Sequence, residues 1–356
     1  MNSRVIITVP NLSLPGGVTE LYNSLNLTRF NRIKYLEINY SNKSNTIFSL
    51  FFIVLKFSWT IENFDVVHLN PSFDKRSFVR DGLFALIARA RGKHILVYWH
   101  GWQDEFYLGV FKKWHWRLFY RLTFSGTDHQ IVLANSFLLK IRKLGYDGLL
   151  TLESNAVDVQ QDVKIDTRKN FLAVPFKILY ISRIVEGKGW DLAIQTMKIV
   201  SEVNSCNIEL LLCGDGPCLA DAKKLAKSLN VANVKFLGYV TGVEKEKVIA
   251  SCDLCFFPTC YPEGMPMSIL ESTVAGLPII TRNEGGIKDH LKHGVNGYIL
   301  DSKDPRDFAK LILELYEDDE LYNKMRQANL ELGAEKFTKD KFIERLFSYY
   351  DDLVSK

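Results

Sequence analysis

Two glutamates flank a Gly-Met-Pro turn in YPEGMPMSILE, a stretch that ends at Glu271. Pro266 suits the first position of a helix, because its missing N–H costs nothing there. The amides of Met267 and Ser268 are then unpaired donors at a positive helix end, which favours a phosphate or a sugar oxygen. Glu263 can accept hydrogen bonds from ligand hydroxyls, and Glu271, deeper in the helix, can hold the paired hydroxyls of a ribose. Either carboxylate alone is equally well explained as ordinary helix chemistry.

A second group of candidates is cationic. In SRIVEGKGWDLAI, Arg183 follows an expected strand and Lys188 stands between two glycines. Two cations in a glycine-rich turn from strand to helix suit a diphosphate, because the helix N-terminus adds its dipole and its free amides. A solvated basic turn explains these residues about equally well. The turn CGDGP, which contains Gly214, follows the next expected strand, and a plain loop accounts for it.

The elements that must position these residues come from the alternation of short β-rich runs with helical patterns. The alternation stops once, in a polar segment over 155–175 that indicates an interdomain linker. A βα alternation that occurs twice predicts an α/β protein with two doubly wound parallel-sheet domains, and ligands bind at the carboxyl ends of such strands. The expected strands are 4–10, 65–70, 94–100, 130–135, 177–182, 208–214, 234–240, 254–259 and 277–281.

The length of 356 residues agrees with two domains of ordinary size. We expect an N-terminal, acceptor-binding domain over 1–160 and a nucleotide-sugar-binding domain over 161–335. A C-terminal helix over 336–356 can pack back on the first domain. The assignment of a ligand to each domain depends on the family resemblance described below.

The charge of the chain is unevenly distributed. Residues 1–155 carry 19 Lys and Arg against 11 Asp and Glu, a balance of +8, and the remainder carries 26 against 30, a balance of −4. The basic half must meet or tolerate an anionic partner. Because no nucleic-acid motif or repeated aromatic platform is visible, we expect no nucleic acid among the partners.

The cysteines and the apolar runs indicate the compartment. All six cysteines lie between Cys206 and Cys260 and no secretory signal precedes them, which favours reduced thiols in the cytoplasm. Cys252 and Cys255 form a CxxC within an apolar run, so we expect small core residues and neither a metal nor a redox site. The longest apolar run, 49–55, is too short to span a membrane.

The segment 106–124, FYLGVFKKWHWRLFYRLTF, combines basic and aromatic residues. As a single helix it aligns the cations in one row, flanked by amphipathic rings, which suits an anionic membrane surface. An ordinary surface helix is the alternative. We therefore expect a cytoplasmic protein peripherally associated with the inner face of the cell membrane. The row is Lys113, Arg117 and Arg121, the flanking rings are Trp114, Trp116 and Tyr120, and the expected core side is Phe111, Leu118, Phe119 and Leu122.

The motifs of the second half resemble, in order and across most of 177–300, those of the family 4 retaining glycosyltransferases. These are GT-B fold enzymes, with two Rossmann-like domains facing across a cleft, that use nucleotide-activated sugars. The resemblance implies that Arg183 and Lys188 bind the donor diphosphate, Glu263 contacts the donor sugar and Glu271 binds the ribose. The implied donor-binding residues are Gly16, Gly17, Arg183, Lys188, Gly214, Tyr239, Val240, Glu263, Gly264, Met265, Pro266, Met267, Ser268 and Glu271.

In the first half the resemblance covers Gly16 and Gly17, which a simple turn also explains, and His100, where the family has a sugar-contacting histidine. It makes His100, Glu263, Arg183 and Lys188 the implied catalytic set. Ala156 departs from the glycine that the family usually carries. No Asp-x-Asp occurs in the chain, in agreement with a reaction that needs no metal and no cofactor. The family is thought to use front-face attack, with the departing phosphate taking the acceptor's proton.

The expected function is transfer of a hexose from a nucleotide diphosphate sugar, with UDP-sugars favoured over GDP-mannose. The expected acceptor is a lipid-linked saccharide in the assembly of O-antigen, lipopolysaccharide, capsule or exopolysaccharide. One alternative is another GT-B enzyme, acting on a soluble acceptor or as a sugar-nucleotide epimerase. A second alternative is a non-catalytic module that binds a nucleotide sugar. A dehydrogenase is disfavoured, because no G-x-G-x-x-G follows the first strand.

Overall fold

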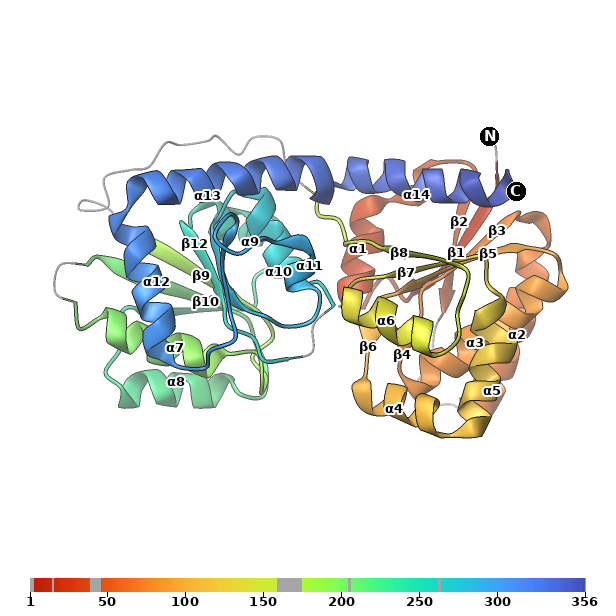
Figure 1. The fold of residues 1–356 in the computed structure, drawn as a ribbon, viewed down its shortest axis with the longest axis horizontal. Helices are drawn as coiled ribbons and strands as arrows, with labels where there is room; N and C mark the ends of the chain where they lie inside the picture. The colour runs from red at the N-terminus through yellow and green to blue at the C-terminus, as the bar shows by residue number, and fades with distance from the viewer. Residues whose placement is uncertain are drawn as a thin grey trace. The chain divides into compact units, whose positions relative to one another are not determined.

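The chain forms two compact units, each built on a parallel sheet (Figure 1). The computed structural model describes residues 3–14, 16–38, 46–158, 175–203, 206–261 and 264–355. Unit 1 comprises Met1–Asp158 together with Lys339–Lys356, and unit 2 comprises Val159–Thr338. Most of the expected linker, 155–175, lies outside the described residues.

Unit 1 contains a six-stranded parallel sheet in the order β2-β1-β3-β5-β7-β8. The central strand β1, VIITVP, is rich in β-branched residues and buried, as a strand covered on both faces must be. Its Val5 is in register with Ile33 on one side and Val66 on the other. The strands are β1 Val5–Pro10, β2 Ile33–Ile38, β3 Val66–Leu69, β5 His94–Trp99, β7 His129–Val132 and β8 Leu149–Leu152, and a small separate sheet pairs β4 Ser72–Phe73 with β6 Gly101–Trp102.

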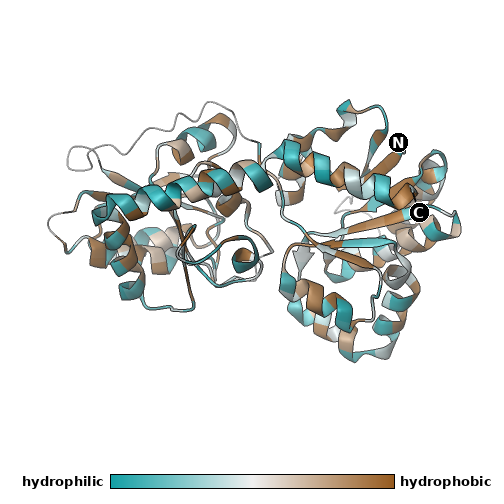
Figure 2. Ribbon diagram, turned by 45° about the horizontal axis from the view of Figure 1, so that its top comes forward, coloured by the Kyte–Doolittle hydropathy of each residue, from teal (hydrophilic) through white to brown (hydrophobic). Residues whose placement is uncertain are grey.

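Helices cover both faces of this sheet. One apolar core gathers Leu21 and Tyr22 from the first helix with Phe342 and Tyr350 from the last. The other core contains Trp99 and a cluster of phenylalanines, and Figure 2 shows brown, apolar segments on strands and on helices of the unit. The helices of the unit are α1 Gly17–Leu25, α2 Thr46–Thr60, α3 Lys75–Ala90, α4 Asp104–Lys112, α5 Trp114–Thr123, α6 Asn135–Lys143 and α14 Lys339–Val354.

Helix α14 follows unit 2 in the chain but packs on unit 1, beside α1 and the strands β3 and β5. An ion pair fixes it there. Arg345 donates from Nε to Glu153 Oε2 at 2.8 Å and from Nη2 to Oε1 at 3.1 Å. Because Glu153 is only 3% exposed, its carboxylate requires such a partner.

Unit 2 repeats the design with the strand order β11-β10-β9-β12-β13-β14, all parallel. The strands are β9 Phe176–Ile181, β10 Ile208–Cys213, β11 Val234–Gly238, β12 Leu254–Phe257, β13 Ile279–Arg282 and β14 Gly297–Leu300. The helices are α7 Trp190–Val200, α8 Leu219–Ser228, α9 Gly242–Ala250, α10 Met267–Val274, α11 Ile287–His290, α12 Pro305–Glu317 and α13 Asp319–Leu332.

The prediction of two doubly wound α/β sheets is confirmed. The nine expected strands are present, and the structure adds the edge strands β2, β8 and β14 and the short strands β4 and β6. A strand at the edge of a sheet is only half covered, so its sequence need not carry the continuous apolar run that identifies a central strand. Within the described part of the chain, no helix is both long and apolar enough to cross a bilayer.

Candidate functional site

The site candidates of unit 2 lie in loops that follow parallel strands and therefore share the carboxyl edge of one sheet. Main-chain hydrogen bonds join these loops directly. Ser182 N donates to Cys213 O at 3.1 Å, and Gly286 N donates to Gly264 O at 2.8 Å. Cys260 N donates to the carbonyl of Gly187 at 2.7 Å. The loops after β9, β10, β12 and β13 consequently form one connected framework.

Two glycines allow the main chains of these loops to contact one another. Gly189 has φ 78°, and a Cβ there would lie 2.2 Å from Pro258 O. Gly214 has φ 142°, and a Cβ there would lie 1.8 Å from Ser182 O. Both positions combine a backbone conformation that favours glycine with contact to a neighbouring main chain. The close approach of Ser182 O therefore explains why position 214 is a glycine, which the CGDGP motif alone does not show.

The two candidate cations lie on the loop after β9. Arg183 is exposed. Lys188 is partly buried, with Nζ 4.4 Å from the centroid of the Tyr261 ring, a cation–π contact that holds the long side chain near the loop after β12. The carbonyl of Lys188 accepts a hydrogen bond from Tyr180 Oη at 3.0 Å. The backbone that carries the cation is therefore fixed by the sheet.

Helix α10 begins at Met267, and Pro266 is its N-cap. The prediction that Pro266 takes the first helical position was therefore wrong by one residue, since its ψ of 131° is extended. No side chain among the described residues caps this helix, so the amides at its start face outward with the positive end of the dipole. Met265 is buried beneath the turn. Glu263 lies outside the described residues.

Glu271 is paired with a lysine that the sequence did not identify. Its Oε1 lies 2.7 Å from Nζ of Lys245, on helix α9, and both side chains are largely buried. A largely buried carboxylate is costly unless it is paired, so this partner stabilises it. No sequence signal marks Lys245, because the two residues lie on different helices and share no local spacing.

Two further donor candidates follow β11. Tyr239 is exposed, whereas Val240 is buried. Gly214 N donates to Gly238 O at 2.6 Å, so this strand end is tied to the CGDGP turn. An exposed ring at a strand's carboxyl end is suited to stacking against a planar base.

Arg282 also stabilises the loops at the carboxyl edge of the unit 2 sheet, and the sequence analysis did not identify it. It is buried, donates from Nε to Ser302 O at 2.8 Å and from Nη2 to Asp301 O at 3.0 Å. Its Nη1 reaches Glu284 Oε1 at 3.0 Å and Cys260 Sγ at 2.7 Å. One guanidinium therefore braces the chain after β12, β13 and β14.

In unit 1, the glycine pair lies at the carboxyl edge of the sheet. Gly16 precedes α1 and Gly17 begins it, with no side-chain cap among the described residues. A Cβ at Gly17 would meet nothing within 4 Å, and one at Gly16 would only touch Thr19 Oγ1 at 3.6 Å. The packing of unit 1 therefore does not require glycine at either position.

His100 follows β5 and contacts Asn70, which follows β3. His100 Nε2 lies 2.8 Å from Asn70 Oδ1, and the imidazole lies against the ring of Tyr98 with centroids 4.2 Å apart. Burial lowers the pKa of His100 to about 3. The ring is therefore neutral at physiological pH.

The expectation that Cys252 and Cys255 are core residues is confirmed. Cys252 and Cys255 are buried, and desolvation raises the pKa of both thiols, that of Cys255 to about 12. Cys213 is buried nearby, with a pKa raised to about 12 for the same reason. Buried, protonated thiols of this kind are inert.

The basic segment 106–124 differs from its prediction. It forms two helices, α4 and α5, which meet at Lys113 in an extended conformation, so the row of cations at helical spacing is interrupted. Leu118 and Leu122 were expected in the core but are exposed, as is Phe111 on α4. The expected surface ring Tyr120 is fully buried, while Phe119 packs partly buried against the core as predicted. Because of the break at Lys113 and the packing of Phe119 and Tyr120 against Phe78, α5 turns a different face to the core than the one predicted.

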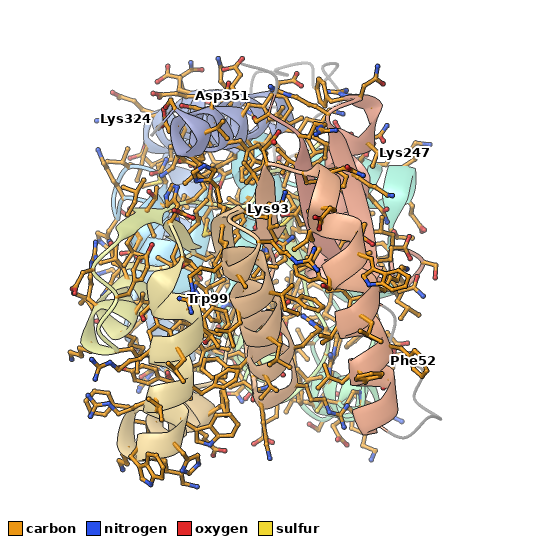
Figure 3. The ribbon with its side chains drawn as sticks, turned by 90° about the vertical axis from the view of Figure 1, so that its right-hand side faces the viewer. Phe52, Lys93, Trp99, Lys247, Lys324 and Asp351 are labelled. Carbon is orange, nitrogen blue, oxygen red and sulfur yellow. The ribbon has the colours of Figure 1, made fainter. Side chains whose placement is uncertain are left out.

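In this orientation, α4 and α5 expose apolar side chains with cations beside them. Trp114 is 74% exposed, and Lys112, Arg117 and Arg121 are exposed close to it in the chain. Helix α2 presents its own apolar stripe, Phe51, Phe52, Leu55 and Trp59, of which Trp59 is 80% exposed. Helices α2, α3 and α5 lie side by side, and Phe52 points outward from α2 (Figure 3).

Comparison with known proteins identifies relatives of each part of the chain. The model of the family "Glycosyl transferases group 1" matches residues 163–331. The N-acetyl-alpha-D-glucosaminyl L-malate synthase of Bacillus anthracis is 30% identical over 179 residues, 50% of this chain and 45% of that protein. The lipopolysaccharide core biosynthesis glycosyltransferase LpsE of Rhizobium meliloti is 25% identical over 282 residues, 76% of this chain and 78% of that protein.

The solved structure of Anabaena Alr3699/HepE in complex with UDP superposes with a TM-score of 0.77 at 15% identity, covering 98% of this chain and 100% of that chain. At this identity the likeness shows a shared fold. The chain spans about half the length of the curated relatives that it matches first.

Proposed function

We propose that the chain is a group 1 glycosyltransferase, of family 4 with the GT-B fold, and that it transfers a hexose from a nucleotide diphosphate sugar to a saccharide acceptor with retention of configuration. The observation that carries the proposal is the connected carboxyl edge of unit 2. It holds two cations, a helix start that no described side chain caps and a lysine-paired glutamate on adjoining elements. These groups suit the successive parts of a nucleotide diphosphate sugar.

In this proposal the diphosphate is bound by Arg183 and Lys188 together with the start of α10, where the helix dipole favours negative charge. Glu271 binds the ribose hydroxyls, and the exposed Tyr239 stacks on the base. Glu263 contacts the donor sugar by resemblance alone. The solved structures of HepE with UDP and glucose, and of TarM with UDP, favour UDP as the nucleotide.

The proposed reaction forms a bond from the acceptor's hydroxyl oxygen to the anomeric carbon, on the face from which the nucleotide diphosphate leaves. The bond from that carbon to the diphosphate oxygen breaks, and the departing phosphate takes the hydroxyl proton. The cations and the helix start stabilise the charge that develops on the leaving group. His100, being neutral, contributes a hydrogen bond to a sugar.

The acceptor is proposed to be a lipid-linked saccharide of a cell-surface polysaccharide. The relatives include the amylovoran biosynthesis glycosyltransferase AmsK of Erwinia amylovora, which supports this setting. The protein would then dock peripherally on the inner face of the cell membrane through α4, α5 and α2. Exposed rings beside cations are the combination that binds anionic lipid interfaces.

A donor panel tests the proposed function. The full chain is titrated with UDP-, GDP- and ADP-sugars and with UDP alone in a thermal-shift assay, because a ligand that binds the native state raises Tm. Release of UDP is then measured with and without saccharide acceptors. We expect stabilisation by UDP-sugars and release that depends on acceptor. A changed sugar nucleotide without release would indicate an epimerase, and binding without turnover would indicate a binding module; either result overturns the proposal.

A further inference from the structure

A continuous line of hydrogen bonds runs through the interior of unit 1, from helix α14 to His100. Tyr350 Oη lies 2.6 Å from His68 Nδ1, and His68 Nε2 lies 3.4 Å from Tyr22 Oη. Tyr22 Oη donates to Asn70 Oδ1 at 2.8 Å, and His100 Nε2 lies 2.8 Å from the same oxygen. Both His68 and Tyr22 are fully buried, so each polar group in this line needs its partner.

The orientation of the Asn70 amide fixes the proton on His100. Asn70 Nδ2 donates to the carbonyl of Thr8 at 2.7 Å, so Oδ1 is the end that faces Tyr22 and His100. An amide oxygen only accepts hydrogen bonds. His100 Nε2 must therefore carry a proton.

The remaining protons then have a single consistent arrangement. Because Tyr22 uses its proton on Asn70, His68 Nε2–H donates to Tyr22 Oη, and His68 Nδ1 accepts from Tyr350 Oη. Burial lowers the pKa of both histidines, which agrees with neutral rings. The titratable groups around His100 are Tyr22, Tyr98 and His68, and burial keeps these tyrosines protonated by raising their pKa.

A neutral ring protonated at Nε2 leaves Nδ1 of His100 as a hydrogen-bond acceptor. This atom is buried and has no hydrogen-bond partner within the described part of the chain. Unsatisfied buried groups are rare in native proteins, and a ligand is one of their explanations. An acceptor takes a hydrogen bond from a hydroxyl and cannot serve a phosphate oxygen.

We propose that Asn70 is a positioning residue, which holds His100 as the neutral Nε2–H tautomer so that Nδ1 accepts a hydrogen bond from a sugar hydroxyl. The sugar ligand rests on the proposed function, whereas the tautomer does not. Tyr22 supports the arrangement by sharing Asn70 Oδ1, and Tyr350 connects it to the C-terminal helix.

The tautomer is tested directly by long-range ¹H–¹⁵N spectra of the ¹⁵N-histidine-labelled full chain, with His100→Gln to assign the signal. At pH 7 the wild type should show the Nε2–H pattern for His100. Asn70→Ala should change or broaden that pattern. Tyr35→Phe is the matched control, since it removes a partly buried tyrosine hydroxyl that bonds Tyr22 O and Leu27 N outside the line. An Nδ1–H tautomer or a charged ring in the wild type, or an unchanged pattern in Asn70→Ala, overturns the proposal.

Measurements of kcat distinguish a positioning role of Asn70 from a general loss of folded protein. Misorienting a contact residue costs on the order of ten- to a hundredfold in rate. Asn70→Ala should lower kcat by about that much while the Kd for UDP stays unchanged, because the residues proposed above to contact UDP, Arg183, Lys188, Tyr239 and Glu271, lie in unit 2. Tyr22→Phe should show a smaller loss of kcat and Tyr35→Phe none. Equal losses in Asn70→Ala and Tyr35→Phe would contradict a specific role for Asn70. If no sugar nucleotide turns over at all, the proposed function fails and the spectra still decide on the tautomer.

Discussion

Glu271 Oε1 lies 2.7 Å from Nζ of Lys245, so the carboxylate proposed to bind a ribose is held in place by a cation from the neighbouring helix. The pair is mostly shielded from solvent, with side-chain exposures of 15% and 22%. Salt therefore screens the attraction between these two charges less than it screens a surface ion pair. The two residues are coupled, and substitutions at either should affect nucleotide binding.

Glu271→Ala is expected to weaken UDP binding by about tenfold or more, because it removes an acceptor for two hydroxyls, each worth roughly 1 kcal/mol or more. Lys245→Met should weaken binding less and lower the free energy of unfolding by about 1–3 kcal/mol, since it removes the cation beside a partly buried carboxylate. Isothermal calorimetry and urea unfolding measure the two effects. Glu209→Ala, which breaks the ion pair with Lys235, is the control. UDP affinity that is unchanged in Glu271→Ala would refute the ribose assignment.

Arg183→Ala and Lys188→Ala should each reduce affinity for UDP by about tenfold, because a charge-assisted hydrogen bond contributes roughly 1.5–3 kcal/mol. Affinity for uridine, which lacks the diphosphate, should not change. The same substitutions should lower the salt dependence of UDP binding. Arg306→Ala removes an exposed cation of unit 2 and serves as the control. Equal losses for UDP and uridine would argue against contact with the diphosphate.

Arg345→Ala should destabilise unit 1 by about 3 kcal/mol, since it leaves the buried Glu153 without its bidentate partner. Helix α14 should then be released more readily, which limited proteolysis near 339 detects as faster cleavage. Lys341→Ala breaks an exposed pair with Glu344 on the same helix and should cost no more than about 0.5 kcal/mol. Similar proteolysis rates in the two variants would contradict the anchoring role.

The cysteines should fall into two classes in a labelling experiment. Cys206, Cys218 and Cys260 are partly exposed and should react with iodoacetamide at pH 8, whereas Cys213, Cys252 and Cys255 should react only after unfolding. Burial raises the pKa of Cys213 from 9.0 to about 12, so the native thiol keeps its proton where the unfolded thiol loses it. The free energy of unfolding should therefore fall as the pH rises above 9. Peptide mass spectrometry identifies the labelled sites, and rapid native labelling of Cys255 would contradict the assignment.

Vesicle co-sedimentation tests the proposed membrane docking. The protein should bind vesicles that contain an anionic lipid at low salt and should bind neutral vesicles weakly. Reversing Arg117 and Arg121 to glutamate should weaken binding by about tenfold or more, at roughly 1 kcal/mol for each charge near the surface. Trp114→Ser should reduce any blue shift of tryptophan fluorescence on binding. Lys324→Glu, on unit 2, is the charge control, and an equal effect there would leave the α4–α5 surface without a specific role.

The sequence was informative where a signal is local. Buried parallel strands carry continuous apolar runs, so β9, β10 and β12 were predicted, whereas edge strands such as β2 and β8 were not. The phase of α5 was predicted wrongly, because neither glycine nor proline marks the break at Lys113 and tertiary packing of the aromatics decides the orientation.

Contacts between side chains that lie far apart in the chain could not be predicted from the sequence. The motifs identified Glu271, Arg183 and Lys188 as candidates, but hydrophobic periodicity says nothing about which side chain on another helix will meet them. Lys245 is separated from Glu271 by a strand and two loops, and Tyr350 reaches His68 from the opposite end of the chain. Such pairs follow only from the completed sheet and its crossovers.

The position of α14 has a consequence for how the protein is made. The helix supplies Phe342, Leu346 and Tyr350 to the core of unit 1, yet it leaves the ribosome only after the whole of unit 2. During synthesis the part of that sheet face which α14 covers therefore stays exposed beside α1 until the helix is made. Translation speed through unit 2 sets how long that surface is available to chaperones or to aggregation. A pause in that region of the message would act on the folding yield of a unit already synthesised.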